Sequence, residues 1–258
     1  MRTGSLFTSP ATLAVVMAVF PTFLTGMSAL AAQDGVKDWT RIWGTSEYDA
    51  GRAVCVDATG IAYVAGDTSG GLNGQSPLGG RDVFLSAFSA NGARLWSRVW
   101  GSKTNDYALG VAADASESIY VVGYTGGSFD GEANPGGEEA LLTKYGIDGT
   151  REWSRIWGSG STEHAHGVAV AADGAIYVAG HTTGAFDGAT NSGSSDAFLS
   201  RFTADGTREW SRVWGSSKSD YVNGMAVDSD GNIYVTGYAY GAFDEQTTKG
   251  GCDAFLTR

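Results

Sequence analysis

The chain has 258 residues, of which 42% are hydrophobic and 17% charged, enough to bury one sizeable core or two small ones. Its 39 glycines against 4 prolines, with 8 tryptophans, 11 tyrosines and 11 phenylalanines, predict many turns joined by aromatic-rich strands and not a helical bundle. The formal net charge is −11, which argues against nucleic acid and anionic membrane surfaces as partners because like charges repel.

The N-terminal segment has the layout of a secretory signal peptide. Arg2 precedes a long uncharged segment that is apolar over 11–27, and the Ala-Leu-Ala ending at Ala31 fits the small-x-small pattern of a cleavage site. An uncleaved membrane anchor is the alternative. We therefore expect a signal peptide over 1–31, a short linker over 32–37, and an exported mature protein that is secreted, periplasmic or at the cell surface.

The rest of the chain repeats with a period of 57 residues. A Trp-x-Arg-x-Trp-Gly motif occurs four times and accounts for all eight tryptophans, and a tyrosine followed three residues later by glycine keeps the same spacing. Because the motif hardly varies, we expect it to be architectural, packing outer strands between repeats. The motifs begin at Trp39, Trp96, Trp153 and Trp210, and the tyrosines are Tyr63, Tyr120, Tyr177 and Tyr234.

Each repeat predicts four short strands. Asp-Gly or Asn-Gly dipeptides indicate tight hairpins between the first and second strands and between the third and fourth. Tandem four-stranded antiparallel units favour an all-β fold, a β-propeller with one repeat per blade over 38–258; an open stack of β-meanders is the alternative. In the first copy the strands are expected at Ala50–Val56, Ile61–Gly66, Asp82–Phe88 and Arg94–Trp100.

Three segments resemble a known family, the SBBP-type β-propeller repeat of secreted bacterial and archaeal proteins. They are 224–237 (Gly-Met-Ala-Val-Asp-Ser-Asp-Gly-Asn-Ile-Tyr-Val-Thr-Gly), 253–257 (Asp-Ala-Phe-Leu-Thr) and, in complete copies, 205–211 (Asp-Gly-Thr-Arg-Glu-Trp-Ser). The resemblance covers 38–258. It implies a β-propeller outside the cytoplasm, and it carries over no catalytic motif.

The two ends of the repeat region predict how a ring closes. The mature chain begins with a lone fourth strand at Asp38–Gly44 and ends in a third strand at Cys252–Arg258. If these strands pair, they complete the last blade of a closed four-bladed ring. A fragment of a larger propeller and an oligomer that completes one ring are the open alternatives.

Two further features each have two interpretations. Cys55 and Cys252 lie in an oxidising compartment, where a disulfide forms, but they occupy unlike positions of the repeat. The run Asp228-Ser229-Asp230-Gly231-Asn232 resembles a short calcium loop, whereas the equivalent positions of other copies keep only a hairpin turn. Both the disulfide and the calcium site stay open at this point.

Long connections such as Thr68–Arg81 lie on the side of the disc opposite the hairpins, and we expect this loop face to carry the function. An acid at the start of each first strand lies there. These acids have two interpretations. In one, the four carboxylates form a ring that holds a cation at the channel; in the other, each accepts backbone N–H bonds at the start of its own strand. They are Asp49, Asp106, Glu163 and Asp220.

The three histidines of the chain also fall on this face. If Asp173-Gly174 is a two-residue turn, His166 lies directly opposite His181 and close to His164, a cluster able to ligate zinc or copper. The other copies have tyrosines at the His164 and His181 positions, which suits sugar or peptide contacts. These are Tyr107, Tyr124, Tyr221 and Tyr238.

No catalytic motif is present: the sequence has no Gly-x-Ser-x-Gly elbow, no His-Glu-x-x-His and no phosphate-binding loop before a helix. The sequence therefore predicts an exported, non-catalytic binding or scaffold protein whose loop face recognises carbohydrate, peptide or a surface protein. The alternatives are a secreted hydrolase or lyase, or a metal-binding propeller, with its site at the channel mouth. Calcium and a transition metal are the candidate cofactors, and the chain is expected to be a monomer or a ring-completing oligomer.

Overall fold

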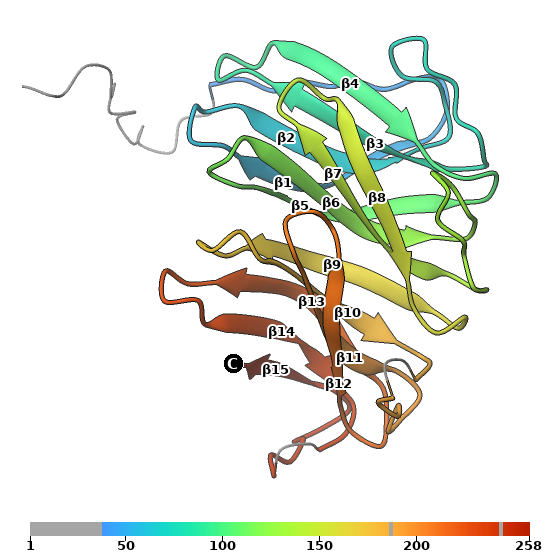
Figure 1. The fold of residues 1–258 in the computed structure, drawn as a ribbon, viewed down its shortest axis with the longest axis vertical. Helices are drawn as coiled ribbons and strands as arrows, with labels where there is room; N and C mark the ends of the chain where they lie inside the picture. Colours follow the sequence, from blue (N-terminus) through green and yellow to red (C-terminus); the bar gives the residue numbers. More distant parts are fainter. Residues whose placement is uncertain (1–37, 186–187, 243–244) are drawn as a thin grey trace, which may run out of the picture. The chain divides into compact units, whose positions relative to one another are not determined.

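The computed structural model describes residues 38–185, 188–242 and 245–258, and these contain strands and turns without a helix (Figure 1). Fifteen strands form four antiparallel sheets, three of four strands and one of three. The predicted all-β repeat architecture is confirmed. In this part of the chain no helix is long and apolar enough to cross a membrane. The predicted signal peptide and linker, 1–37, lie outside the described residues.

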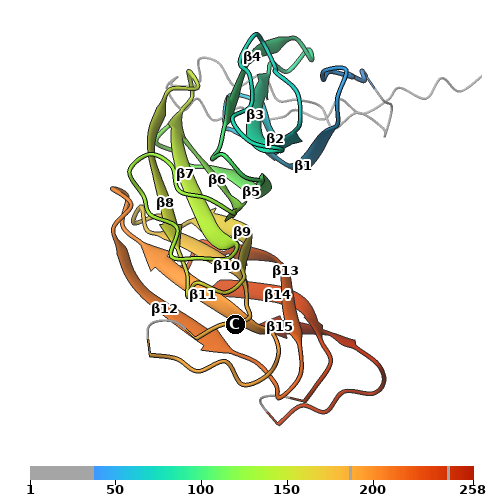
Figure 2. The same cartoon turned by 90° about the vertical axis from the view of Figure 1, so that its right-hand side faces the viewer.

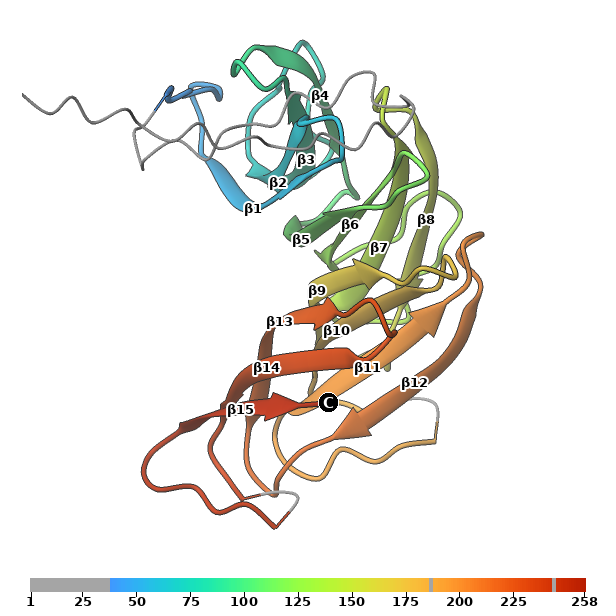
Figure 3. The ribbon, with the colours of Figure 1, turned by 90° about the vertical axis from the view of Figure 1, so that its left-hand side faces the viewer.

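Each sheet is a meander whose strands follow in chain order, and the first strands of successive sheets contact one another, β1 to β5 to β9 to β13 (Figures 2 and 3). The predicted strands of the first repeat agree with the structure to within two residues at every end. The sheets are β1 (Asp49–Val56), β2 (Ala62–Thr68), β3 (Asp82–Phe88) and β4 (Arg94–Trp100); β5 (Asp106–Ala113), β6 (Ser118–Thr125), β7 (Glu139–Gly146) and β8 (Arg151–Trp157); β9 (Glu163–Val170), β10 (Ile176–Thr182), β11 (Asp196–Phe202) and β12 (Arg208–Trp214); β13 (Asp220–Val227), β14 (Ile233–Ala239) and β15 (Asp253–Thr257).

An aspartate side chain holds the first hairpin of a blade together. The Asp57 carboxylate accepts the backbone N–H groups of Thr59 and Ile61 at 2.8 and 3.0 Å and the hydroxyl of Tyr63 at 2.9 Å. Gly60 follows with a φ of +87°, in the left-handed region that favours glycine. The repeated tyrosine is therefore part of the hairpin, and its hydroxyl bonds to the turn again in Asp114–Tyr120 and Asp228–Tyr234.

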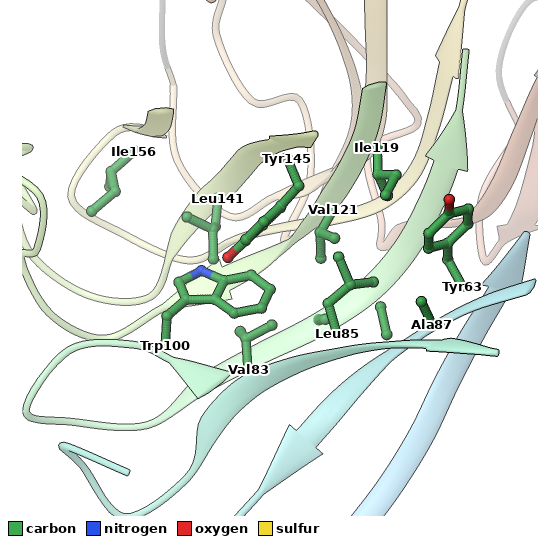
Figure 4. Close-up of a cluster of buried hydrophobic side chains, with 12 residues drawn as sticks. Tyr63, Val83, Leu85, Ala87, Trp100, Ile119, Val121, Leu141, Tyr145 and Ile156 are labelled. Carbon is green, nitrogen blue, oxygen red and sulfur yellow. The ribbon is translucent and has the colours of Figure 1, made fainter. Parts of the chain in front are cut away.

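The core lies between neighbouring sheets, where aromatic and branched side chains of both interdigitate (Figure 4). Trp100, the last residue of β4, packs against Tyr145 of β7 with ring centroids 4.9 Å apart, and both side chains are buried. Val83, Leu85 and Leu141 surround them without exposed surface. The second tryptophan of this repeat motif is thus a core residue joining two blades.

The arginine of the same motif ties each blade to the next. Arg98 donates from Nε to the carbonyl of Gly149 at 2.9 Å and from Nη2 to that of Asp148 at 3.1 Å, both in the outer hairpin of the second sheet. Its guanidinium also lies 5.3 Å from the ring centroid of Trp96. Arg155 binds the next blade in the same way, so the motif is architectural, as predicted.

The predicted pairing of the two chain ends is not formed among the described residues. β15 pairs with β14 alone, and Trp39–Gly44 is not a strand. This segment instead lies against the first sheet, where Arg41 donates to the carbonyls of Asn91 and Gly92 at 3.0 and 2.8 Å, as an outer strand of a preceding blade would. The segment is not a strand in the structure because no strand lies beside it to form a ladder.

Candidate functional site

Connections at one end of the sheets are linked from blade to blade, and we call this end the loop face. Here the first strand of each sheet begins, the second strand ends, and the long connection between second and third strands lies beside the connection to the next blade. Single parallel bridges join these connections at Arg81–Asn105, Glu138–Thr162 and Ser195–Ser219. The glycine-containing hairpins lie at the opposite ends of the strands.

Each of the four predicted acids accepts a backbone N–H at its own strand start. The donor lies four residues earlier in every blade, and Asp106, Glu163 and Asp220 have no exposed surface. Their carboxylates are therefore held by their own connections and do not form an exposed ring. The N–H to oxygen distances are 2.6 Å for Thr45 to Asp49, 2.6 Å for Ser102 to Asp106, 2.8 Å for Ser159 to Glu163 and 2.5 Å for Ser216 to Asp220.

Three of these acids also meet a second buried acid from the preceding blade, which the sequence reasoning missed. A Cβ atom on Gly158 would lie 1.9 Å from Glu139 Oε2 and 2.2 Å from Glu163 Oε2, so the two carboxyl groups converge beside this glycine. The signal was present, since an acid also starts every third strand at the 57-residue spacing. The pairs are Asp82–Asp106, Glu139–Glu163 and Asp196–Asp220, and all six side chains are fully buried.

Burial and the neighbouring acid make these carboxyls hard to ionise. Burial raises the pKa of Asp106 to about 6, against the hydrogen bonds it accepts, and Asp82 adds to the rise. Burial also raises the pKa of Asp82, and the pKa of Glu139 lies well above its ordinary range because of burial and the adjoining Glu163. Since none of these side chains is exposed, the pairs do not present two carboxylates to a glycoside substrate.

The other seven predicted site residues come together in one continuous series of ring contacts, which we call the aromatic run. Tyr124 stacks on His164 with ring centroids 3.8 Å apart and an angle of 19° between the planes. His181 contacts Tyr221 at 4.9 Å, which carries the series into the next blade. The run comprises Tyr107, Tyr124, His164, His166, His181, Tyr221 and Tyr238, from three blades.

The run extends at both ends to residues that sequence reasoning did not select. Tyr240, 41% exposed, lies 6.0 Å from Tyr238. At the other end the guanidinium of Arg81 lies 5.6 Å from the ring of Tyr107 and 4.1 Å from that of Tyr48, which is 48% exposed. A half-exposed tyrosine therefore ends the series on each side.

The first blade replaces the aromatic run with an ion cluster. Ala50 and Asp67 stand where the other blades have tyrosine or histidine. Asp67 is fully buried and pairs with Arg52 at 2.7 Å and with Arg81 at 3.2 Å. The same location thus carries different chemistry in different blades.

The predicted register around the histidines is wrong. His181 pairs with His164, and His166 falls at a β-bulge that the ladder skips. The hairpin is longer than two residues, because Gly174 N–H bonds to the carbonyl of Ala171 while Ala171 N–H bonds to that of Ala175. The three rings still meet: His181 lies 5.1 Å from His164 and 5.0 Å from His166 between ring centroids.

Two histidines of the cluster are uncharged. Burial, helped by the adjacent imidazoles, lowers the pKa of His166 to about 4 and that of His181 to about 3. Both are therefore neutral at physiological pH. The third ring, His164, has a hydrogen-bond partner: its Nε2 lies 2.7 Å from Glu138 Oε2.

The two ambiguous sequence features have simple structures. Cys55 and Cys252 are free thiols, so no disulfide joins them, and burial raises the pKa of Cys55 to about 12. In the run that resembles a calcium loop, the Asp228 carboxylate accepts the N–H groups of Asp230 and Asn232 and the side-chain amide of Asn232. Those bonds describe a hairpin turn.

Residues 209–244 match the SBBP family model, a β-propeller repeat. The segment includes β13, its hairpin and β14, which are the parts of the blade that hold the turn aspartate and the repeated tyrosine. The predicted SBBP-type repeat is confirmed.

One curated relative and several solved structures are similar over longer stretches. The regulatory protein FlaEY of Caulobacter vibrioides is 26% identical over 255 residues, an alignment that covers 87% of this chain and 27% of that protein. This chain therefore spans about a quarter of that relative's length. A protein of unknown function from Bacteroides caccae superposes with a TM-score of 0.44 at 9% identity, covering 73% of this chain and 53% of the other. A glucose dehydrogenase superposes with a TM-score of 0.40 at 13% identity, covering 81% and 62%.

Proposed function

We propose that this chain is an exported, non-catalytic β-propeller that binds a peptide, a carbohydrate or a neighbouring surface protein through its loop face. The observation that carries the proposal is the aromatic run, which crosses three blades and ends on the half-exposed Tyr48 and Tyr240. Tyrosine supplies a large, rigid contact area with a polar edge, and it is enriched where proteins bind other molecules.

The stacking within the run favours a peptide or protein ligand over a sugar bound face-on. Tyr107 stacks on Tyr124 at 24°, and Tyr221 stacks on Tyr238 at 27°, so neighbouring rings cover one another's faces. Ring edges and hydroxyl groups are then what a ligand meets. These groups suit the backbone amides of an extended segment. The net charge of −11 favours a neutral or basic partner and disfavours nucleic acid.

Ring closure belongs to the same proposal. We propose that Trp39–Gly44 supplies the missing outer strand of the last blade, next to β15. Its contacts with the first sheet already match those of a preceding blade's outer strand. Val54 of β1 is 65% exposed and Leu256 of β15 is 70% exposed, although both lie on strands whose equivalents pack between blades. A closed ring would cover both apolar side chains.

The experiment screens the purified chain against a peptide display library and a glycan array. We expect a peptide ligand, and we expect the double variant Tyr107→Phe/Tyr221→Phe to weaken its binding about tenfold, as the loss of about 1.4 kcal/mol of hydrogen bonding would. Tyr234→Phe is the matched control because that hydroxyl bonds to Asp228 at the opposite end of the blade. Binding that is equal in both variants, or no ligand in either screen, would contradict the proposal.

A further inference from the structure

We propose that His164, His166 and His181 form a binding site for one divalent transition-metal ion of the kind that prefers imidazole nitrogen, with Zn²⁺ and Cu²⁺ as the leading candidates. This inference goes beyond ligand binding by the tyrosines and does not depend on it. Three protein ligands leave a fourth position open to solvent or to a further ligand.

The geometry of the three rings is close to what one ion requires. One nitrogen from each imidazole lies within 4.8 Å of the other two, and among the described residues this is the one such group of three potential ligands. Nitrogens that share an ion at about 2.0–2.1 Å lie roughly 3.4 Å apart at the tetrahedral angle. Side-chain rotations that move each nitrogen by about an ångström would therefore bring all three within reach of one ion. The β-bulge at His166 helps, because the ring centroids of His166 and His181 lie 5.0 Å apart.

Two ring nitrogens without a hydrogen-bond partner point to a ligand. His166 Nε2 and His181 Nδ1 are buried and have no hydrogen-bond partner, and the His181 residue is only 8% exposed. Buried polar atoms are normally satisfied, so two unpartnered nitrogens in one cluster call for an explanation.

Glu138 completes the arrangement from outside the cluster. Its Oε2 lies 2.7 Å from His164 Nε2. In the tautomer that carries its hydrogen on Nε2, His164 donates a hydrogen bond to this carboxylate and keeps the Nδ1 lone pair for an ion. A carboxylate behind a ligating histidine fixes the tautomer and raises the basicity of the ring.

A purely structural role does not account for the three histidines. The neighbouring blades build the same bulge and the same pairing with other side chains, so the fold does not need imidazole there. The residues equivalent to His164, His166 and His181 are Ala50, Arg52 and Asp67 in the first blade, Tyr107, Leu109 and Tyr124 in the second, and Tyr221, Asn223 and Tyr238 in the fourth.

The test is titration of the chelator-treated chain with ZnCl2 and with CuSO4 by calorimetry, together with electron paramagnetic resonance of the copper form. We expect one equivalent of metal and a copper spectrum with imidazole nitrogen couplings. His166→Leu, which installs the residue that the second blade carries, should abolish stoichiometric binding while circular dichroism stays unchanged. Glu138→Ala should weaken binding by about 10–100-fold.

Cys252→Ser is the control, because an exposed thiol also binds these metals, and it should leave the affinity unchanged. Metal binding that survives His166→Leu, or that disappears with Cys252→Ser, would overturn the proposal. So would the absence of binding in the folded, chelator-treated chain.

Discussion

The buried acid pairs contribute stability that is lost as the pH rises, and Asp106→Asn tests this contribution. Asp106 is fully buried between the first and second sheets, and a Cβ atom on Gly101 would lie 2.5 Å from its Oδ2 and 2.9 Å from Cγ of Asp82. Asparagine keeps an oxygen for the N–H of Ser102 and adds an N–H that can donate to Asp82. The variant therefore removes the titration and keeps the shape.

The expected magnitude follows from the pKa. The pKa of Asp106 rises from an ordinary value of 3.8 to about 6, roughly two units at about 1.36 kcal/mol each, or about 3 kcal/mol in all. Because the folded state binds the proton more tightly, this stabilisation is fully present below about pH 3.8 and is lost as the pH rises through about 6. Wild type should lose about 3 kcal/mol between pH 3 and pH 7 through this group, and the variant should not.

The assay is urea unfolding followed by tryptophan fluorescence from pH 3 to pH 7, comparing wild type, Asp106→Asn and the exposed turn variant Asp230→Asn. The quantity of interest is the difference in unfolding free energy between variant and wild type at each pH, in which the titrations common to both cancel. We expect this difference to change by about 3 kcal/mol for Asp106→Asn; Asp230→Asn is the control for the same Asp-to-Asn change at an exposed position. A constant difference at all pH values would show that Asp106 does not carry a proton in the folded state.

The remaining predictions concern the architecture. Trp157→Ala should lower the unfolding free energy by about 3–5 kcal/mol because that side chain is buried, whereas Trp153→Ala, at a half-buried ring of the same motif, should lower it less; urea unfolding measures both. Ring closure predicts that Thr40 and Thr257 face each other as Ser86 and Ser97 do in the first sheet, so Thr40→Cys/Thr257→Cys should form an intramolecular disulfide under oxidation, resolved by non-reducing electrophoresis. The control Thr40→Cys/Leu256→Cys is one residue out of register and should not, and a covalent dimer or no cross-link would argue against closure within one chain.

The strands could be predicted from the sequence because their determinants are local. β3 and β4 begin and end at the predicted residues, since two short segments rich in apolar and aromatic residues flank an Asn-Gly turn, with Gly92 at a φ of +78°, and this pattern does not depend on other blades. Four copies also confirm one another, because a turn that is weak in one repeat is clear in the next. Because each repeat contains its own strand and turn signals, the strands of a repeat protein can be predicted from its sequence.

The sequence did not predict features that depend on contacts between strands or between blades, namely the acid pairs, the register at the histidines and the state of Trp39–Gly44. Asp82 and Asp106 are 24 positions apart and look like ordinary strand-start acids until two sheets pack. The bulge at His166 adds one residue to one strand, and a one-residue slip changes every partner that follows. Trp39–Gly44 has the sequence of an outer strand, but a strand needs a neighbour, and the segment has none in the structure.

Comparing the blades position by position separates architecture from function. Positions that hold the fold barely vary, as the Trp-x-Arg-x-Trp motif and the turn tyrosine show. The side chains at the loop ends of the two inner strands differ in chemistry among the blades. One blade has an ion pair between Arg52 and the buried Asp67, where another has the neutral His166 and His181. These side chains occupy equivalent positions in the two blades, at or opposite a β-bulge in the first strand that both blades share. Because packing does not require any one of them, the differences among blades support the proposal that a ligand binds at the loop face.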